Sequence, residues 1–212
     1  MDREFWLQRW QERRIGFHTG EPNPLLIRNF PRLKLPEDSR VFVPLCGKTV
    51  DINWLLMNAC RVVGVELAEQ AVRELFDELN LKPEISTVAD LHKYSAADID
   101  IFTGDIFHLT PDMLGSVDAI YDRAALVALP DGMRARYAQH LVHITGNAPQ
   151  LLITFEYDQN RQQGPPFSVS AGQVREFYAS QYTIELCESL EVPGGLKGVC
   201  PAKEFVWRLA RK

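Results

Sequence analysis

The sequence predicts an α/β fold with one doubly wound, mostly parallel sheet that ends in an antiparallel hairpin and follows an N-terminal helical extension. Two observations predict it. After Glu37, short apolar and β-branched runs alternate with helical stretches, as in right-handed β–α–β crossovers. Near the C-terminus, two longer runs flank the turn Pro193-Gly194-Gly195, which is typical of a hairpin. Five parallel strands and the hairpin would make a seven-stranded sheet.

Composition supports a single domain over residues 1–212. Hydrophobic residues make up 46% and charged residues 24% of the chain, which excludes a disordered chain, a collagen-like fibre and a coiled-coil rod. A chain of 212 residues can bury a sizeable core. Because there is neither an internal repeat nor a Ser/Gly linker, we take residues 1–36 as a helical extension of that domain.

The extension contains two predicted helices. Residues 4–14 place Trp6 and Trp10 one turn apart on the same helix face, a spacing that most often packs on a core. Asn23 and Pro24 suit the N-cap and first position of a second helix, which we expect to end at Pro31.

The β–α rhythm begins after this extension. Buried parallel strands are predicted at residues 41–45, 61–66, 99–103, 117–121 and 151–155. Helices are predicted near 50–59, 68–80 and 131–145, and a further helix begins after Ser170, a plausible N-cap. The hairpin strands fall at 182–191 and 203–210. A parallel sheet finished by such a hairpin favours the S-adenosylmethionine methyltransferase architecture over most dinucleotide-binding folds.

Ligands of open α/β sheets bind at the carboxyl ends of the strands. The first strand runs into a turn with Gly47, where the backbone can approach a ligand closely. The second strand ends at Glu66, 19 positions later. An acidic residue at this spacing can accept hydrogen bonds from both hydroxyls of a ribose. The alternative is that Glu66 caps the following helix, since first turns favour acids.

Two further strand ends carry charge. Asp105 follows the third strand and could accept a hydrogen bond from an adenine amino group, although Asp is also a common turn former. The fourth strand ends in Asp122-Arg123. Unpaired buried charges are costly, so Arg123 should meet a ligand carboxylate or an internal partner.

Several classes of protein are disfavoured. The net charge of −5 argues against a nucleic-acid partner, and no apolar run approaches the roughly 18 residues of a membrane span. The charged start of the chain argues against a signal peptide. The four cysteines form no C-x-x-C pair, so we expect buried, reduced thiols in a cytoplasmic protein at Cys46, Cys60, Cys187 and Cys200.

The sequence lacks complete motifs for binding a nucleoside triphosphate, a dinucleotide or a metal ion. Residues 46–49 read CGKT, like the end of a phosphate-binding loop, but Phe42 stands where that loop needs its first glycine. The dinucleotide fingerprint G-x-G-x-x-G is absent. His140 and His143 lack a third ligand nearby, so no metal site is expected.

Longer motifs carry a family resemblance. Taken together, these motifs make the chain similar to bacterial thiopurine S-methyltransferases along nearly its whole length. The stretches that carry the resemblance are WLQRW (6–10), GFH (16–18), VFVPLCGKTVDINWL (41–55), VVGVEL (62–67), DIF (105–107), YDRAALVALP (121–130) and GPPF (164–167).

The resemblance implies a class I, Rossmann-like methyltransferase that uses S-adenosyl-L-methionine. Its substrates would be small aromatic or heterocyclic thiols, with selenium or tellurium compounds as further acceptors. It implies that Leu45, Gly47 and Glu66 hold the cofactor, that Trp6 and Trp10 close over it from the 1–36 cover, and that Asp105 and Ile106 meet the adenine. Arg123 would line the site near methionine and substrate, Phe17 would pack on the acceptor, and Lys197 would loosely replace an arginine that animal members carry.

The expected chemistry needs little acid–base catalysis. A thiolate is already a strong nucleophile near neutral pH, so no general base is assigned, and His18 is the one obvious candidate near the site. Two alternatives stay open, an O- or N-methyltransferase and a non-catalytic S-adenosylmethionine-binding protein. The evenly charged composition permits a monomer.

Overall fold

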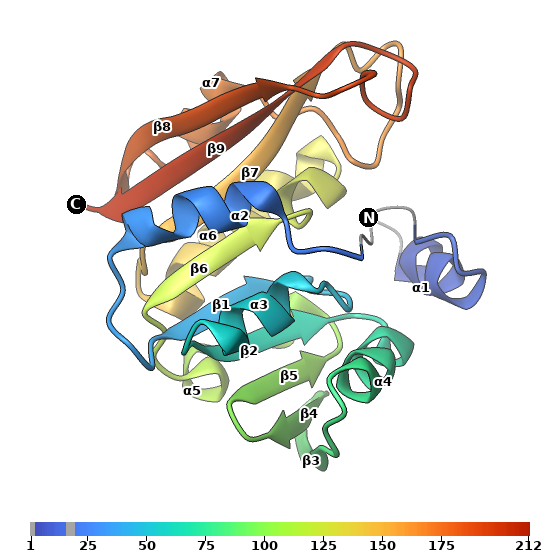
Figure 1. The fold of residues 1–212 in the computed structure, drawn as a ribbon, viewed down its shortest axis with the longest axis vertical. Coiled ribbons are helices and arrows are strands. Elements are labelled where there is room, and N and C mark those ends of the chain that lie inside the picture. Colours follow the sequence, from blue (N-terminus) through green and yellow to red (C-terminus); the bar gives the residue numbers. More distant parts are fainter. Residues whose placement is uncertain (1–2, 16–19) are drawn as a thin grey trace.

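The computed structural model describes residues 3–15 and 20–212. Within them one nine-stranded sheet runs through the molecule in the order β3-β4-β5-β2-β1-β6-β7-β9-β8 (Figure 1). The strand order reverses at β1 (Arg40–Pro44), which pairs with β2 (Arg61–Glu66) on one side and β6 (Ala119–Arg123) on the other. This reversal is the switch point at which open α/β sheets bind ligands.

The predicted parallel centre and terminal hairpin are confirmed. β5 (Ile99–Thr103) pairs in parallel with β2, and β7 (Gln150–Tyr157) pairs in parallel with β6. β8 (Tyr182–Glu191) and β9 (Ala202–Arg211) form the antiparallel hairpin, and β9 also pairs antiparallel with β7. The strand expected at 117–121 lies two residues later, which places Asp122 and Arg123 inside β6.

The predicted strand number was too low, because two strands beyond β5 were missed. β3 (Glu84–Val88) and β4 (Leu91–Ala96) extend the sheet as antiparallel strands. β3 is an edge strand whose side chains are mostly exposed, and β4 buries only Leu91 and Tyr94. Neither strand therefore has the continuous apolar run that marks a strand buried on both faces.

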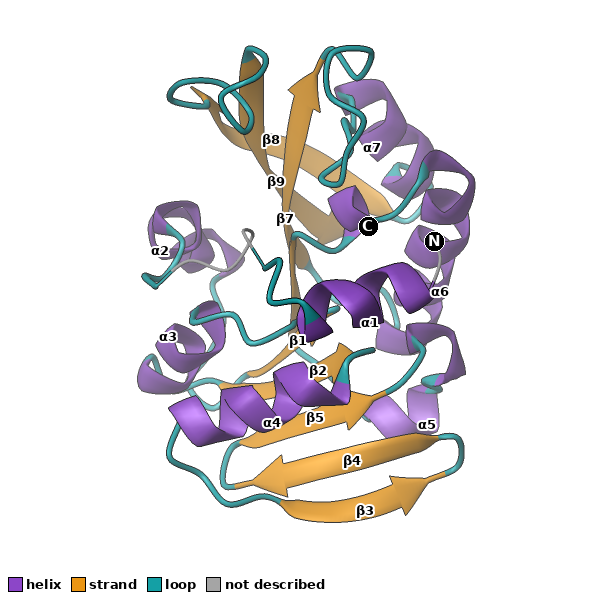
Figure 2. Cartoon of the chain, turned by 90° about the vertical axis from the view of Figure 1, so that its right-hand side faces the viewer, coloured by secondary structure: helices purple, strands orange, loops and turns teal. Residues whose placement is uncertain are grey.

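Helices cover both faces of the sheet, and one helix lies beyond the strand ends. In Figure 2, α2, α3 and α4 lie on one side of the sheet and α5, α6 and α7 on the other, while α1 crosses the carboxyl ends of the central strands. Their bounds are α1 Arg3–Gln11, α2 Pro24–Asn29, α3 Asp51–Met57, α4 Glu69–Glu78, α5 Pro111–Leu114, α6 Asp131–Thr145 and α7 Ala171–Tyr178, with 3-10 helices at Phe30–Leu33, Ile106–His108 and Leu126–Ala128. No helix among the described residues combines the length and the apolar character needed to cross a bilayer.

Both predicted N-caps are confirmed. The Asn23 side chain accepts a hydrogen bond from the Leu25 backbone N–H at 2.8 Å. Ser170 forms a capping box with Gln173 at the start of α7. The expected end of this helix before Pro31 is also confirmed, since α2 ends at Asn29 with Phe30 as its C-cap; a separate 3-10 helix then carries the chain to Leu33.

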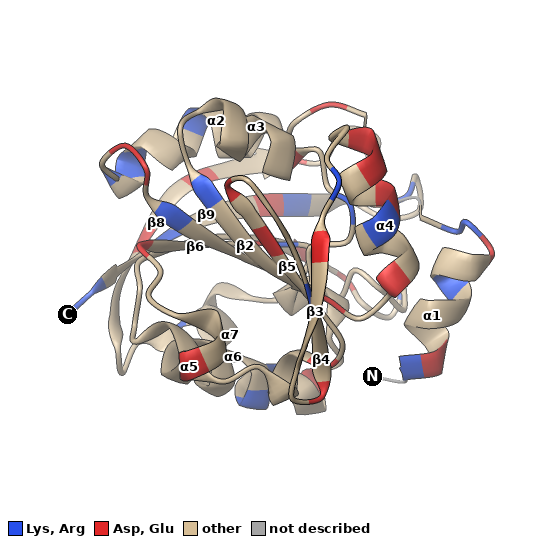
Figure 3. Ribbon diagram, turned by 90° about the horizontal axis from the view of Figure 1, so that it is seen from below, with Lys and Arg blue, Asp and Glu red and all other residues tan. Residues whose placement is uncertain are grey.

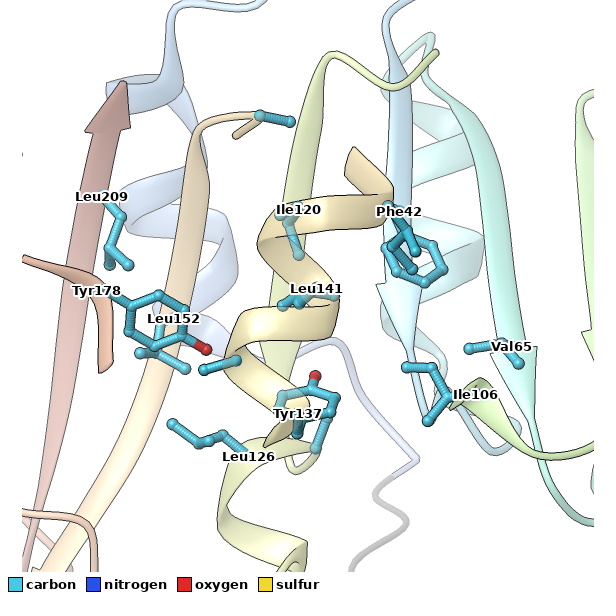
Figure 4. Packing of buried hydrophobic residues seen from close by; sticks show 14 of the residues in the cluster. Phe42, Val65, Ile106, Ile120, Leu126, Tyr137, Leu141, Leu152, Tyr178 and Leu209 are labelled. Carbon is cyan, nitrogen blue, oxygen red and sulfur yellow. The ribbon is translucent and has the colours of Figure 1, made fainter. Parts of the chain in front are cut away.

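The sheet separates two apolar clusters, and the larger one lies beneath α6 and α7. Figure 4 shows Tyr137 and Leu141 of α6 beside Ile120 and Leu152 of the sheet, all nearly or fully buried. The other cluster packs α2, α3 and α4 against the opposite face. These two layers fix the positions of the strand ends.

A buried carboxylate, Asp122, links β6 to the helices over the larger cluster. Asp122 is 0% exposed and accepts hydrogen bonds from the Leu126 backbone N–H at 3.1 Å and from the Tyr137 hydroxyl at 2.8 Å. Desolvation raises the pKa of Asp122 to about 6, although these hydrogen bonds act in the opposite direction. The folded protein therefore favours protonated Asp122 more than the unfolded chain does.

This raised pKa predicts a pH dependence that Asp122→Asn should remove. The contribution of Asp122 is fully present below pH ~4, the unfolded pKa, and is lost as the pH rises through about 6, on the order of 3 kcal/mol. Relative to Asp122→Asn, the wild-type protein should lose unfolding free energy between pH 4.5 and 7.5 in urea titrations. A constant difference between the two proteins across this range would contradict the assignment.

Candidate active site

The carboxyl ends of β1, β2, β5 and β6 open into one cavity of about 650 Å³. The turns after these strands line its floor. Helix α1, which crosses these strand ends in Figure 2, adds further lining residues. Loop residues 165–166 and 196–197 complete its rim. The site is therefore built where the topology predicts a ligand.

Glu66, at the end of β2, connects two parts of the floor. Its carboxylate accepts hydrogen bonds from the Gly47 backbone N–H at 2.8 Å and from the Ala68 backbone N–H at 2.9 Å. Burial raises the pKa of Glu66, while its hydrogen bonds to backbone N–H groups favour the ionised form. Ala68 is the N-cap residue of α4, so the Glu66 carboxylate holds the helix start, as the capping alternative expects, and it also lines the cavity.

The backbone of these turns is held in a conformation that is rare for side-chain-bearing residues. Leu45 has φ +46° and Ala124 has φ +62°, both in the left-handed region, and both line the cavity. Gly47 has φ +52°, and a Cβ there would lie 3.1 Å from the Trp10 ring. Strained residues of this kind persist where the surrounding structure fixes them, often at functional sites.

The two tryptophans of α1 both line the cavity, and Trp10 also packs on the fold. Trp10 is 3% exposed and clusters with Ala68 and Ala71 at the start of α4. Trp6 is half-buried and meets Phe5 edge-on, with ring centroids 5.4 Å apart. The packing role and the lining role therefore coexist on this helix.

The turn after β5 presents Asp105 and Ile106 to the cavity. The Asp105 carboxylate accepts a hydrogen bond from the Phe107 backbone N–H at 3.0 Å and so caps a 3-10 helix. Ile106 is 4% exposed, and its carbonyl contacts the His140 ring nitrogen at 2.8 Å. This places His140 in a structural contact, and no metal cluster is found within the described part of the chain.

Arg123 has the internal partner that its buried position requires. Its Nη1 lies 3.9 Å from an Asp51 carboxylate oxygen, and the Tyr121 hydroxyl donates to the same oxygen at 3.0 Å. Asp51, Tyr121 and Arg123 all line the cavity. The Arg123 guanidinium, on a side chain that is 19% exposed, makes no hydrogen bond within the described residues and has its donors available to a ligand.

The part of the cavity beyond Arg123 is mainly apolar. Lys197 adds one charge at the rim, where its ammonium group donates to the Pro165 carbonyl at 2.7 Å, and burial lowers the pKa of Lys197 with a smaller contribution from Arg9. Such a surface suits a flat, apolar ring. The apolar lining residues on this side are Val127, Ala128, Leu129, Met133, Phe155, Pro165, Pro166 and Leu196.

Most of the residues expected in the site meet around this one cavity. Phe17 and His18 lie outside the described residues. Those that line the cavity are Trp6, Trp10, Leu45, Gly47, Glu66, Asp105, Ile106, Arg123 and Lys197.

The residues excluded from the chemistry have structural contacts. Acidic residues gather along α4 (Figure 3), and Lys48 binds two of them, Glu74 at 2.8 Å and Glu78 at 2.6 Å. Burial, with a smaller effect of Glu66, raises the pKa of the Cys46 thiol well above its ordinary value. All four cysteines are free thiols; Cys187 is half-buried and the other three are buried.

Sequence reasoning missed several lining residues. Asp51 stands four positions after Gly47, at the start of the helix predicted near 50–59, where an acid is expected to be a capping residue. Met133 lies in a helix and Phe155 in a strand, and their apolar patterns predicted that both residues would pack in the hydrophobic core. The GPPF motif marked Pro165 and Pro166 without suggesting what they contact.

Comparisons with known proteins agree on the family. The thiopurine S-methyltransferase family model matches residues 1–212. A thiopurine S-methyltransferase of Xanthobacter autotrophicus is 55% identical over 212 residues, covering 100% of both chains. One of Gluconobacter oxydans is 50% identical over 206 residues, covering 97% of this chain and 94% of the relative.

Solved structures confirm the class I methyltransferase fold. The 1,6-didemethyltoxoflavin-N1-methyltransferase of Burkholderia thailandensis, with 1,6-didemethyltoxoflavin and S-adenosylhomocysteine bound, has a TM-score of 0.67 at 15% identity, covering 98% of this chain and 87% of that chain. An S-adenosylmethionine-dependent methyltransferase of Anabaena variabilis has a TM-score of 0.64 at 14% identity, covering 99% and 95%. From the full-length family match and the 55% identical relative, we conclude that this chain belongs to the thiopurine S-methyltransferase family.

Proposed function

We propose that this protein transfers a methyl group from S-adenosylmethionine to the sulfur of small aromatic or heterocyclic thiols. The observation that carries the proposal is a single cavity with two chemically different halves. One half presents the Glu66 carboxylate beside the Gly47 turn, and the other is an apolar surface with the Arg123 guanidinium beside it. Family membership supports the same reaction.

The first half fits a nucleoside with a ribose diol. Glu66 uses one lone pair on each oxygen for the Gly47 and Ala68 N–H groups. A carboxylate has about four acceptor positions, so it can still accept from two hydroxyls. Trp6, Leu45, Asp105 and Ile106 surround this position with apolar surface and one further acceptor. These residues would hold the cofactor.

When bound there, S-adenosylmethionine supplies an electrophilic methyl group on a sulfonium sulfur. The chain's own contribution is to orient the acceptor and to exclude water, which are the main requirements of a transfer that depends on alignment. The apolar lining from Val127, Met133 and Phe155 packs on the acceptor ring. Arg123 stabilises the negative charge of a thiolate by charge-assisted hydrogen bonds.

The lining favours sulfur over oxygen or nitrogen as the acceptor atom. Among its described residues there is no histidine, and the carboxylates of Asp51, Glu66 and Asp105 already accept hydrogen bonds from the protein. An alcohol needs a general base to become a nucleophile, whereas a thiol ionises near neutral pH.

The proposal also includes that the protein is a cytoplasmic monomer. Selenium and tellurium compounds are proposed as further acceptors, because their larger atoms are also soft nucleophiles.

The function is tested by calorimetric titration with S-adenosylhomocysteine, followed in the same preparation by methyl-transfer assays on thiophenol, phenol and aniline. We expect binding with one site per chain and transfer to thiophenol at a rate at least 100-fold above the other two acceptors. Faster transfer to phenol or aniline would favour the O- or N-methyltransferase alternative. Binding without transfer to any acceptor would favour the non-catalytic one.

Glu66→Gln should weaken cofactor binding. The glutamine replaces one acceptor oxygen with an NH₂ group that faces a backbone N–H or the ribose, and a lost hydrogen bond to a charged group costs about 1.5–3 kcal/mol. The dissociation constant for S-adenosylhomocysteine should rise at least tenfold in calorimetry. Glu69→Gln, on the exposed side of α4 and outside the cavity, is the matched control and should leave it within twofold. Equal affinities for wild type and Glu66→Gln would remove Glu66 from the site.

Arg123→Ala should act mainly on the thiol acceptor. Loss of the guanidinium removes the charge that stabilises the thiolate, so the KM for thiophenol should rise about tenfold or more and turnover should fall. The melting temperature, measured by circular dichroism, should change by only a few degrees, since the ion pair with Asp51 is long and the Asp51 carboxylate keeps its hydrogen bonds from Asn23 and Tyr121. Unchanged kinetics would show that Arg123 does not contact the acceptor.

A further inference from the structure

Asp51 is a charged residue at the floor of the cavity to which the proposed function gives no role. It begins α3, four positions after Gly47, and it is 1% exposed. Burying a carboxylate is costly unless hydrogen bonds and opposite charges compensate, so its partners are informative.

These partners come from two separate parts of the chain. One carboxylate oxygen accepts the Asn23 backbone N–H at 2.6 Å, at the start of α2. The other accepts the Tyr121 hydroxyl at 3.0 Å and lies 3.9 Å from Arg123 Nη1, both on β6. Asp51 therefore connects the N-terminal extension to the arginine of the acceptor half.

We propose that Asp51 is a positioning residue that holds the Arg123 guanidinium toward the acceptor and fixes the start of α2 against the same site. The proposal rests on the proposed function, because it assigns Arg123 to the acceptor. It adds a residue that acts through Arg123 and does not itself touch the thiol.

The length of the ion pair is the main argument. At 3.9 Å the charges of Asp51 and Arg123 attract, yet no hydrogen bond forms, so the five N–H donors of the guanidinium are not used by its partner. A bidentate pair would consume two of these donors. Tyr121 and Asn23 occupy the Asp51 oxygens and keep the carboxylate from rotating to form such a pair.

A second acid near Arg123 does not replace Asp51. Glu204 on β9 interacts electrostatically with Arg123, but burial raises the pKa of Glu204 even though Arg123 and Arg28 act to lower it. Asp51, by contrast, is held in place beside the arginine by two hydrogen bonds to its carboxylate.

Two variants separate the effect of the Asp51 charge from the effect of the hydrogen bonds that hold its side chain. In Asp51→Asn, the remaining oxygen can accept from the Asn23 N–H, and the new NH₂ group can donate to the Tyr121 hydroxyl oxygen. The contact with Tyr121 is then kept with its direction reversed, while the charge beside Arg123 is lost. In Tyr121→Phe, the charge stays and one hydrogen bond is lost. Both keep the side-chain volume nearly constant, and S-adenosylhomocysteine affinity reports whether the cofactor half is intact.

We expect Asp51→Asn to raise the KM for thiophenol at least tenfold, to change kcat less than threefold, and to leave S-adenosylhomocysteine affinity within twofold. Tyr121→Phe should raise the KM less than Asp51→Asn does, because the charge stays and one of the two hydrogen bonds that hold the carboxylate is lost. An unchanged KM in Asp51→Asn would overturn the proposal. The proposal would also be overturned if the KM rose while kcat, cofactor affinity and melting temperature all fell in parallel, because this would indicate a structural role only.

A spectroscopic readout does not depend on transferase activity. The Nε–H resonance of Arg123, assigned by its loss in Arg123→Lys, should shift and broaden in ¹⁵N spectra of Asp51→Asn when the guanidinium is no longer held. If wild-type protein fails to methylate thiols, the proposed function fails while this resonance still tests the link between Asp51 and Arg123. An unperturbed resonance in Asp51→Asn would exclude that link.

Discussion

The site depends on one buried carboxylate, Glu66, and on the two backbone N–H groups that it accepts. These hydrogen bonds tie the turn after β1 to the start of α4, so the floor of the cavity has one arrangement. The left-handed conformations of Leu45 and Gly47 are held by this tie and by Trp10, which packs over Gly47. Burying a carboxylate costs free energy, which these hydrogen bonds offset. The lone pairs that remain on the Glu66 oxygens can also accept hydrogen bonds from a diol ligand.

The carboxyl ends of the central strands bring different chemical groups to the two halves of the cavity. The ends of β1, β2 and β5 place hydrogen-bond acceptors in the half that we propose for the nucleoside, whereas the end of β6 places a guanidinium beside apolar walls. Among the lining residues that the structure describes, none is a histidine that could remove a proton from an alcohol. The combination suits a nucleophile that is already ionised and polarizable, and it explains how positioning can supply most of the catalysis.

The sequence predicted the parts of the molecule that have a repetitive or strongly local signal. The five parallel strands, the caps at Asn23 and Ser170 and the terminal hairpin follow from apolar runs, capping residues and turn chemistry. β3 and β4 were missed because edge strands with exposed side chains lack an apolar run. Spacing identified Gly47 and Glu66, but Asp51 could not be distinguished from a helix-capping acid, since its partners at Asn23 and Tyr121 are distant in sequence.

The most direct test of the account is a crystal structure with S-adenosylhomocysteine and an aromatic thiol bound together. The account predicts the Glu66 carboxylate within hydrogen-bond distance of both ribose hydroxyls and the thiol sulfur beside the Arg123 guanidinium, with the apolar lining around the ring. A ribose bound away from Glu66, or a thiol ring on another surface with Arg123 contacting neither ligand, would contradict it.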